Sequence, residues 1–112
     1  MINDILYIAG PMRRKYRYNF AVFSKACEFL RAKGYQVVSP HEIDLAWGFD
    51  PDAKMEDQSV TMVDMVRRDV EAISLCHTVV TLPGWRQSTG ARAEVAIAKW
   101  LKKPVYPLSK FQ

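Results

Sequence analysis

"TVVTLPGWRQSTGARAEVAIAKWLKKPVYPL", residues 78–108, decides the fold because it contains a strand pattern, a helix pattern and a second strand pattern in succession. The apolar run at 78–83 is too short for a helix and suits a buried strand, and a Pro-Gly pair marks the turn that follows it. From Thr89 onward apolar side chains recur at helical spacing, and another apolar run follows at 104–108. A strand–helix–strand unit predicts two parallel strands joined by a right-handed crossover.

The same alternation runs through the rest of the chain. Short apolar runs at 5–10 and 35–40 predict strands, while residues 20–34 and 59–76 carry apolar side chains at helical spacing. We therefore predict an α/β fold, a three-layer Rossmann-like or flavodoxin-like sandwich around a parallel sheet of four to five strands. At 112 residues we expect a single domain, residues 1–112.

Residues 41–58 interrupt this periodicity. They contain Gly48, Asp50, Pro51 and several acidic residues, so we expect a loop with about one turn of helix. Long loops in compact domains are usually functional or mobile.

The composition excludes several classes of protein. With 49% hydrophobic and 25% charged residues, the chain is typical of a soluble globular protein. No apolar run approaches the roughly 20 residues of a membrane span, and the N-terminus lacks a signal-peptide pattern, so we expect a cytoplasmic protein without a membrane partner. The net charge is +4, but basic residues are dispersed among acidic ones, which argues against binding to a nucleic acid polymer.

The two cysteines, Cys27 and Cys76, fall within apolar helical stretches and do not form a close metal-binding pair. We interpret them as small buried side chains and predict neither a disulfide nor a metal site.

One glutamate is out of place in the helix that begins at Thr89. Its neighbours on the same helical stripe are not polar: Gly90, Ile97, Ala98 and Leu101. The basic residues of the helix lie on a different stripe, so we predict that the Glu94 carboxyl faces the core.

Asp69 repeats this pattern in the preceding helix. Its stripe is also apolar: Met65, Val66, Ala72 and Ile73. Either acid alone is more simply interpreted as partly exposed or salt-bridged. Two inward carboxyls on helices that flank one strand raise each other's pKa and favour a functional site, of the kind that glycosyl transfer uses.

The start of the Thr89 helix lies where a ligand would bind, because ligands of open parallel sheets bind beyond the carboxyl ends of the strands. The helix N-terminus favours the ionised form of Glu94. With Ser88, Gly90 and Arg92 it can also hold an anion such as phosphate, although Ser88 alone is equally well a helix cap. Tyr7, in the first strand, is either a core aromatic residue or a hydroxyl that reaches the same crevice.

Five motifs together resemble the nucleoside 2-deoxyribosyltransferase-like superfamily, which includes nucleoside deoxyribosyltransferases and 2′-deoxynucleoside 5′-monophosphate N-glycosidases. They are "YIAGPM" at 7–12, "YNF" at 18–20, "SP" at 39–40, "RRD" at 67–69 and "LPGWRQSTGARAE" at 82–94. The chain is most similar to a small phage and bacterial branch of unknown function. His77 departs from an aspartate that is frequent in that branch, and we expect it to be structural.

The resemblance implies roles for particular residues. Glu94 matches a nucleophile, Asp69 a helper acid and Tyr7 the tyrosine that steadies the glutamate. Ser88 and Gly90 match a loop that receives the sugar or its 5′-phosphate. Matches to the first-strand loop and helix entry that line the pocket are Gly10, Pro11, Met12, Arg13 and Asn19.

The function that follows is cleavage of the N-glycosidic bond of a (deoxy)nucleoside 5′-monophosphate or nucleoside through a covalent glycosyl–glutamate intermediate, without a cofactor. Two alternatives stay open, a nucleoside deoxyribosyltransferase that exchanges bases and a non-catalytic nucleotide-binding module. In larger members of the superfamily a neighbouring subunit completes the site, so we expect a homodimer or larger homo-oligomer.

Overall fold

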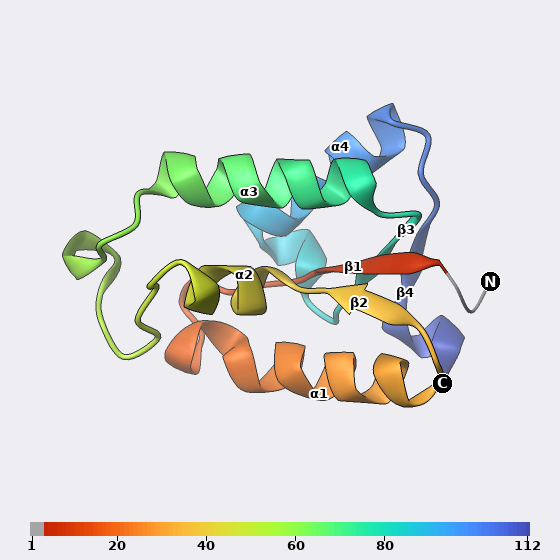
Figure 1. The fold of residues 1–112 in the computed structure, drawn as a ribbon, viewed down its shortest axis with the longest axis horizontal. Helices are drawn as coiled ribbons and strands as arrows, with labels where there is room; N and C mark the ends of the chain where they lie inside the picture. The colour runs from red at the N-terminus through yellow and green to blue at the C-terminus, as the bar shows by residue number, and fades with distance from the viewer. Residues whose placement is uncertain (1–3) are drawn as a thin grey trace.

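A four-stranded parallel sheet lies at the centre of the fold (Figure 1). The computed structural model describes residues 4–112, and the strands follow the order β2-β1-β3-β4. Their bounds are β1 (Ile5–Ala9), β2 (Gln36–Val38), β3 (Thr78–Thr81) and β4 (Val105–Pro107). Every neighbouring pair is parallel, which confirms the predicted α/β class.

Helices cover both faces of this sheet, as Figure 1 shows. Helix α1 (Phe20–Ala32) packs on one face, and α3 (Met62–Leu75) and α4 (Thr89–Trp100) pack on the other. The three-layer sandwich is therefore confirmed. Among residues 4–112, every helix is too short or too polar to cross a bilayer.

The core divides into two layers because strand side chains alternate between faces. Leu6 and Ile8 of β1 belong to the cluster that includes Phe23 of α1, whereas Tyr7 and Ala9 belong to the cluster beneath α3 and α4. Both cysteines are buried free thiols, Cys27 in the first cluster and Cys76 in the second.

Gly10 allows β1 and β3 to end close together. A Cβ atom on Gly10 would lie 2.8 Å from the Cβ of Leu82, which is closer than packed carbon atoms approach. The absence of a side chain at this position therefore brings the carboxyl ends of the two central strands into contact.

The segment expected to be a loop contains a helix, α2 (Pro40–Ala46), of 7 residues, which is longer than the predicted single turn. The rest of the segment includes a short 3-10 helix, Met55–Asp57. Further 3-10 helices lie at Tyr16–Asn19, Trp85–Gln87 and Leu108–Phe111. In Figure 1, α2 lies to the left of β2, on the side to which the carboxyl ends of β1 and β2 point.

Two side chains placed on inward stripes are instead exposed. Val66 is 51% exposed and Leu101 is 47% exposed. The buried strip of α3 is narrow, following Met65 and Ile73, and Val66 is rotated by about 100° from Met65. Leu101 follows the last residue of α4, where the helix has already ended.

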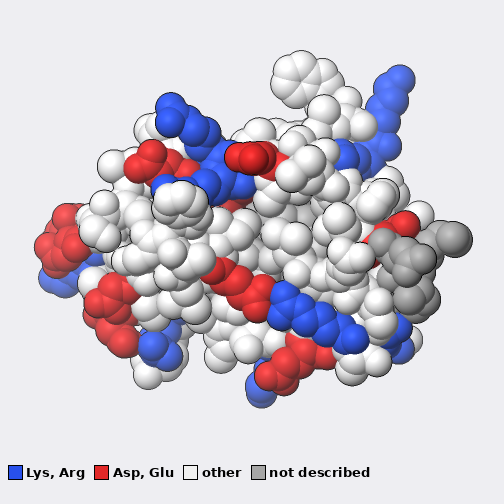
Figure 2. Space-filling view, viewed as in Figure 1, with Lys and Arg blue, Asp and Glu red and all other residues white. Residues whose placement is uncertain are grey.

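The surface charges are mixed on the face shown in Figure 2, where lysine and arginine alternate with acidic side chains. An acidic group at the left-hand end lies over the Met55–Asp57 helix, which carries Glu56 and Asp57. On this face, no broad patch of one sign covers the described residues.

Candidate active site

Three of the residues expected at the site come together on one face of the sheet. Tyr7 comes from β1, Asp69 from α3 and Glu94 from α4, and these three elements pack together on one face of the sheet. The Tyr7 hydroxyl donates a hydrogen bond to Oε2 of Glu94, with an oxygen–oxygen distance of 2.5 Å. The tyrosine hydroxyl thus reaches the site although the Tyr7 side chain is fully buried.

Burial changes the acidity of this pair. Desolvation, and then the negative charge of Asp69, raise the pKa of Glu94 well above its ordinary value of 4.5. The Tyr7 hydrogen bond acts in the opposite direction but is the smaller effect. The helix N-terminus is expected to favour the ionised form of Glu94, whereas burial and the neighbouring carboxyls act in the opposite direction.

Asp69 lies against Glu94, as the inward stripes predicted. Burial, and then the charge of Asp44, raise the pKa of Asp69 from 3.8 to about 7. One oxygen, Oδ1, is buried and has no hydrogen-bond partner among the described residues. A buried acceptor without a donor is costly in a finished core, so this atom is available to a donor on a ligand.

Asp44 is the acidic residue that sequence reasoning missed. It lies on α2 with 5% of its surface exposed, and burial raises its pKa from 3.8 to about 6. A signal for this helix was present, since Ser39, Pro40 and Glu42 have the order of a helix cap, a first-turn proline and a capping-box glutamate. The Ser39 hydroxyl does not cap the helix, however, because it bonds to Nδ1 of His41 at 2.5 Å.

The N-terminus of α4 has a side-chain cap and open space beside its second residue, Gly90. Ser88 caps the helix, accepting a hydrogen bond from the backbone N–H of Ala91 at 3.2 Å. A Cβ atom on Gly90 would meet nothing within 4 Å, so the space beside this glycine is free. Arg92 is exposed and lies two positions from Glu94, about 200° around the helix, so the two side chains are not brought together.

The loop after β1 is held in place by its own polar groups. Asn19 directly precedes α1 in a left-handed conformation with φ 65°, and its side chain does not cap the helix. Its side-chain Nδ2 instead donates to the carbonyl of Pro11 at 2.8 Å. Arg13 extends toward the first residue of α3, where its Nη2 lies 2.9 Å from the sulfur of Met62. Met12 packs against the cluster that contains Phe20.

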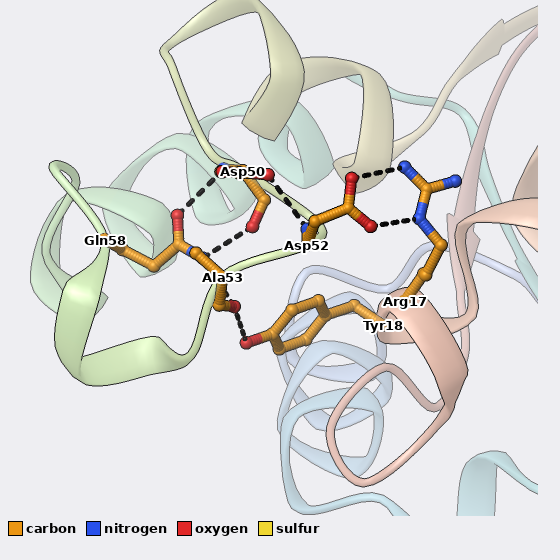
Figure 3. A network of polar contacts seen from close by, with 6 residues as sticks. All are labelled: Arg17, Tyr18, Asp50, Asp52, Ala53 and Gln58. Atoms are coloured by element: carbon orange, nitrogen blue, oxygen red, sulfur yellow. Dashed lines mark hydrogen bonds and ion pairs between the residues drawn. The ribbon is translucent and has the colours of Figure 1, made fainter.

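A second set of contacts joins this loop to the segment after α2 (Figure 3). Arg17 donates to both carboxylate oxygens of Asp52, at 2.7 and 3.2 Å, and the Tyr18 hydroxyl donates to the carbonyl of Ala53 at 2.6 Å. Gln58 closes the segment on itself by bonding to the backbone of Asp50 in both directions. The segment after β1 and the segment after α2, which are far apart in sequence, are therefore held side by side.

Two features lie at the other end of the sheet. The backbone N–H of Ile5 donates to Nδ1 of His77 at 2.8 Å, next to the amino ends of β1 and β3, so His77 is far from the carboxyl groups of the site. A hollow of about 350 Å³ includes Tyr35, Tyr106 and Phe111 in its lining and also lies away from them.

Comparisons with known proteins agree with this architecture. The solved structure of a 2-deoxyribosyltransferase from the psychrotolerant bacterium Bacillus psychrosaccharolyticus aligns with a TM-score of 0.67 and 23% identity, covering 92% of this chain and 70% of that chain. At that identity the likeness establishes a shared fold. No curated protein matches the sequence. Residues 4–106 match a family described as a domain of unknown function (DUF4406), and the chain belongs to that family.

Proposed function

We propose that this protein cleaves the N-glycosidic bond of a nucleoside or a (deoxy)nucleoside 5′-monophosphate, with Glu94 as the nucleophile. The observation that carries the proposal is the Tyr7–Glu94 hydrogen bond of 2.5 Å beside a half-buried second acid, Asp69. Because Tyr7 holds Oε2, we assign the attack on the anomeric carbon, C1′, to the other carboxyl oxygen of Glu94.

The two acids divide the chemistry between them. The cycle starts with Glu94 ionised and Asp69 protonated. As the bond from C1′ to the base nitrogen breaks, the Glu94 carboxylate forms an ester to C1′ and Asp69 gives its proton to the leaving base. Water then attacks C1′, Glu94 leaves as a carboxylate, and the water proton returns to Asp69. The sugar keeps its anomeric configuration because each of the two displacements inverts C1′.

The rest of the site supports a sugar or a sugar phosphate. The N-terminus of α4 offers backbone N–H groups beside the open space at Gly90, and such a terminus favours an anion. Arg13 and the other basic residues of the first loop lie at the same end of the sheet. We propose a 5′-monophosphate as the preferred substrate on this basis, and a homo-oligomer as the active form.

The test is release of free base. The protein is incubated with matched ribo- and deoxyribonucleosides and their 5′-monophosphates, and the products are separated by chromatography. Base release that disappears in both Glu94→Gln and Tyr7→Phe is the expected result. If no member of the panel loses its base, or if Glu94→Gln releases base as fast as the wild type, the proposal fails.

Transfer to a second base is the other candidate, and the similar fold of the 2-deoxyribosyltransferase is what favours it. The two reactions share the glycosyl–Glu94 intermediate and differ in whether water or a base accepts the sugar. Adding a second nucleobase to the assay separates them, because transfer yields a new nucleoside or nucleotide and hydrolysis yields only free base and the sugar or its 5′-phosphate.

A further inference from the structure

We propose that Arg17 and Asp52 are positioning residues of the proposed site. Their ion pair holds a left-handed turn at residues 17–19, and this turn orients the loop after β1, residues 10–19. The inference rests on the proposed function. Neither side chain would contact the substrate, and both would act through the backbone of the loop.

The turn has a backbone conformation that is rare outside glycine. The φ angle is 45° at Arg17, 55° at Tyr18 and 65° at Asn19. In this left-handed region the Cβ atom is crowded by the backbone, and of these three residue types only asparagine adopts it with any frequency. Three such residues in succession persist only where the surrounding structure holds them.

The contacts that hold the turn come from the segment after α2 (Figure 3). Arg17 donates from Nε and Nη2 to the two carboxylate oxygens of Asp52, at 2.7 and 3.2 Å. The Tyr18 hydroxyl donates to the carbonyl of Ala53 at 2.6 Å, and its ring packs edge-on against Phe49 with centres 4.9 Å apart. The ion pair is bidentate and charge-assisted, which makes it the strongest of these polar contacts.

The segment that presents Asp52 is itself fixed. Gln58 donates to the carbonyls of Asp50 and Ala53, at 2.7 and 3.1 Å. The Asp50 carboxylate accepts from the backbone N–H of Asp52 at 2.9 Å. Because the Asp52 carboxylate is held from its own side, it can impose a conformation on the turn.

The turn also determines where the loop after β1 lies. The side chain of Asn19 donates to the carbonyl of Pro11 at 2.8 Å, and a Cβ atom on Gly84 would lie 3.5 Å from the Pro11 ring. Gly84 begins the turn that leads into α4, and Arg13 of the same loop contacts Met62 at the start of α3. The loop therefore touches the entries to both helices that carry the carboxyls of the site. Displacing the turn should affect substrate binding more than the reacting carboxyls.

The test is Asp52→Asn, which removes the charge and keeps the shape. In the ligand-free protein, amide hydrogen exchange at Phe20 reports on the turn, because its N–H bonds to the carbonyl of Arg17. Exchange should accelerate about fivefold, the upper range for an exposed bidentate pair. KM for base release should rise about twofold with kcat unchanged, as for a loop displaced in half of the molecules.

Two further variants separate the ion pair from the backbone conformation that it holds. Arg17→Gly and Arg17→Ala both delete the pair, but glycine adopts the left-handed conformation without strain and alanine does not. Exchange at Phe20 and KM should therefore both rise less in Arg17→Gly than in Arg17→Ala. Equal effects of the two variants would contradict a strained turn.

Glu42→Gln is the matched control. It weakens a second bidentate pair, in which Arg31 donates to Glu42 at 2.8 and 2.6 Å. The side chains of this pair are 42% and 43% exposed, and both residues lie in right-handed helices, α1 and α2. Exchange at Phe20 and KM should both match the wild type in this variant.

Three results for Asp52→Asn would overturn the inference. Unchanged exchange at Phe20 would mean that the ion pair does not hold the turn, and faster exchange with unchanged KM would mean that the turn does not orient the site. A lower KM would mean that Arg17, freed from its partner, binds the substrate directly.

Binding separates a failure of the inference from a failure of the proposed function. If the wild type releases no base, calorimetry with deoxynucleoside 5′-monophosphates replaces KM. Weaker binding by Asp52→Asn than by the wild type would then support the positioning role while the proposed reaction fails. Equal binding, or no binding by either protein, would overturn both.

Discussion

The Glu94 carboxyl affects both the stability of the fold and the proposed reaction, and the substitution Glu94→Gln separates these two effects. Folding raises the pKa of Glu94, so the unfolded chain loses this proton at lower pH than the folded protein does. The stability that the protonated carboxyl contributes is complete below about 4.5 and is lost as pH rises toward the folded pKa.

Glu94→Gln should therefore melt at a temperature equal to or above that of the wild type at pH 8, and the advantage should shrink toward pH 4. The amide oxygen can still accept from Tyr7, so the fold is kept. Base release should fall about a hundredfold or more, because the covalent step is lost. Calorimetry and the base-release assay on one preparation check both. A destabilised variant with normal activity per folded molecule would contradict the nucleophile assignment.

Gly90 provides a separate prediction, since we propose that the sugar lies in the open space beside it. In the first turn of α4, Gly90→Ala meets no clash and should stabilise the protein by about 0.5–1 kcal/mol through reduced backbone entropy. The added methyl group occupies the space proposed for the sugar, so KM should rise. Gly10→Ala is the contrasting variant, because its methyl group would collide with Leu82 at 2.8 Å and lower the melting temperature. An unchanged KM in Gly90→Ala would contradict the placement of the sugar beside Gly90.

The preference for a 5′-monophosphate is tested at two arginines that differ in placement. Arg13 lies in the loop after β1 and reaches toward α3, whereas Arg92 points away from Glu94 around its helix. Arg13→Ala should reduce the ratio of kcat/KM for monophosphate over nucleoside about tenfold, as expected for loss of a charge-assisted contact. Arg92→Ala should change it less. Equal turnover of both substrates by the wild type would end the proposal.

At the scale of elements, the sequence predicted the long periodic segments and failed where tertiary contacts decide. Helices α1, α3 and α4 follow from apolar spacing, and the central strands from short apolar runs. Helix α2 is only seven residues long and lies among turn residues, so its period is too short to detect. Arg17, Tyr18 and Asn19 have positive φ values, and partners such as Asp52 and Ala53 hold them there. Nothing local predicts that conformation for Arg or Tyr.

The same limit applies to the site. Glu94 and Asp69 were predictable because each breaks an apolar stripe on a long helix. Asp44 breaks a stripe too short to be recognised, although it lies in the same acidic cluster. From the residues alone, Tyr7 could be a core aromatic residue or a site hydroxyl; the resemblance favoured the second, and the hydrogen bond to Glu94 places the hydroxyl beside that carboxyl.

Helix α2 also carries a buried histidine, which predicts how this element responds to acid. His41 packs edge-on against Phe20, with ring centres 5.5 Å apart, and burial lowers its pKa below the ordinary value of 6.5. As pH falls below 6.5, the unfolded chain takes up a proton that the folded protein resists, so stability is lost through that window. His41→Gln removes this loss of stability. As pH falls from 7 to 5, the melting temperature of the variant should therefore rise relative to that of the wild type. A difference that stays constant with pH would contradict a buried neutral imidazole.

At the scale of the whole molecule, the exposed apolar side chains of α3 predict how copies of the chain associate. Val63 is 62% exposed and Val66 51%, and they lie three positions apart on the outer face of the helix. Such a stripe suits a two-fold interface, in which the same helix from each copy packs against the other. Because α3 also carries Asp69, this interface would lie beside the proposed site.

Val66→Glu should therefore convert the protein to a monomer and lower base release without lowering the melting temperature of the monomeric fold, since the side chain is already in water. Val22→Glu is the matched control, because Val22 is 44% exposed on α1, across the sheet. Light scattering over a range of protein concentrations gives the mass, and base release at the same concentrations gives the activity. In the expected result Val22→Glu matches the wild type in both. A wild type that is monomeric and fully active, or a Val66→Glu variant that keeps the wild-type mass, would show that this face of α3 is not where the copies meet.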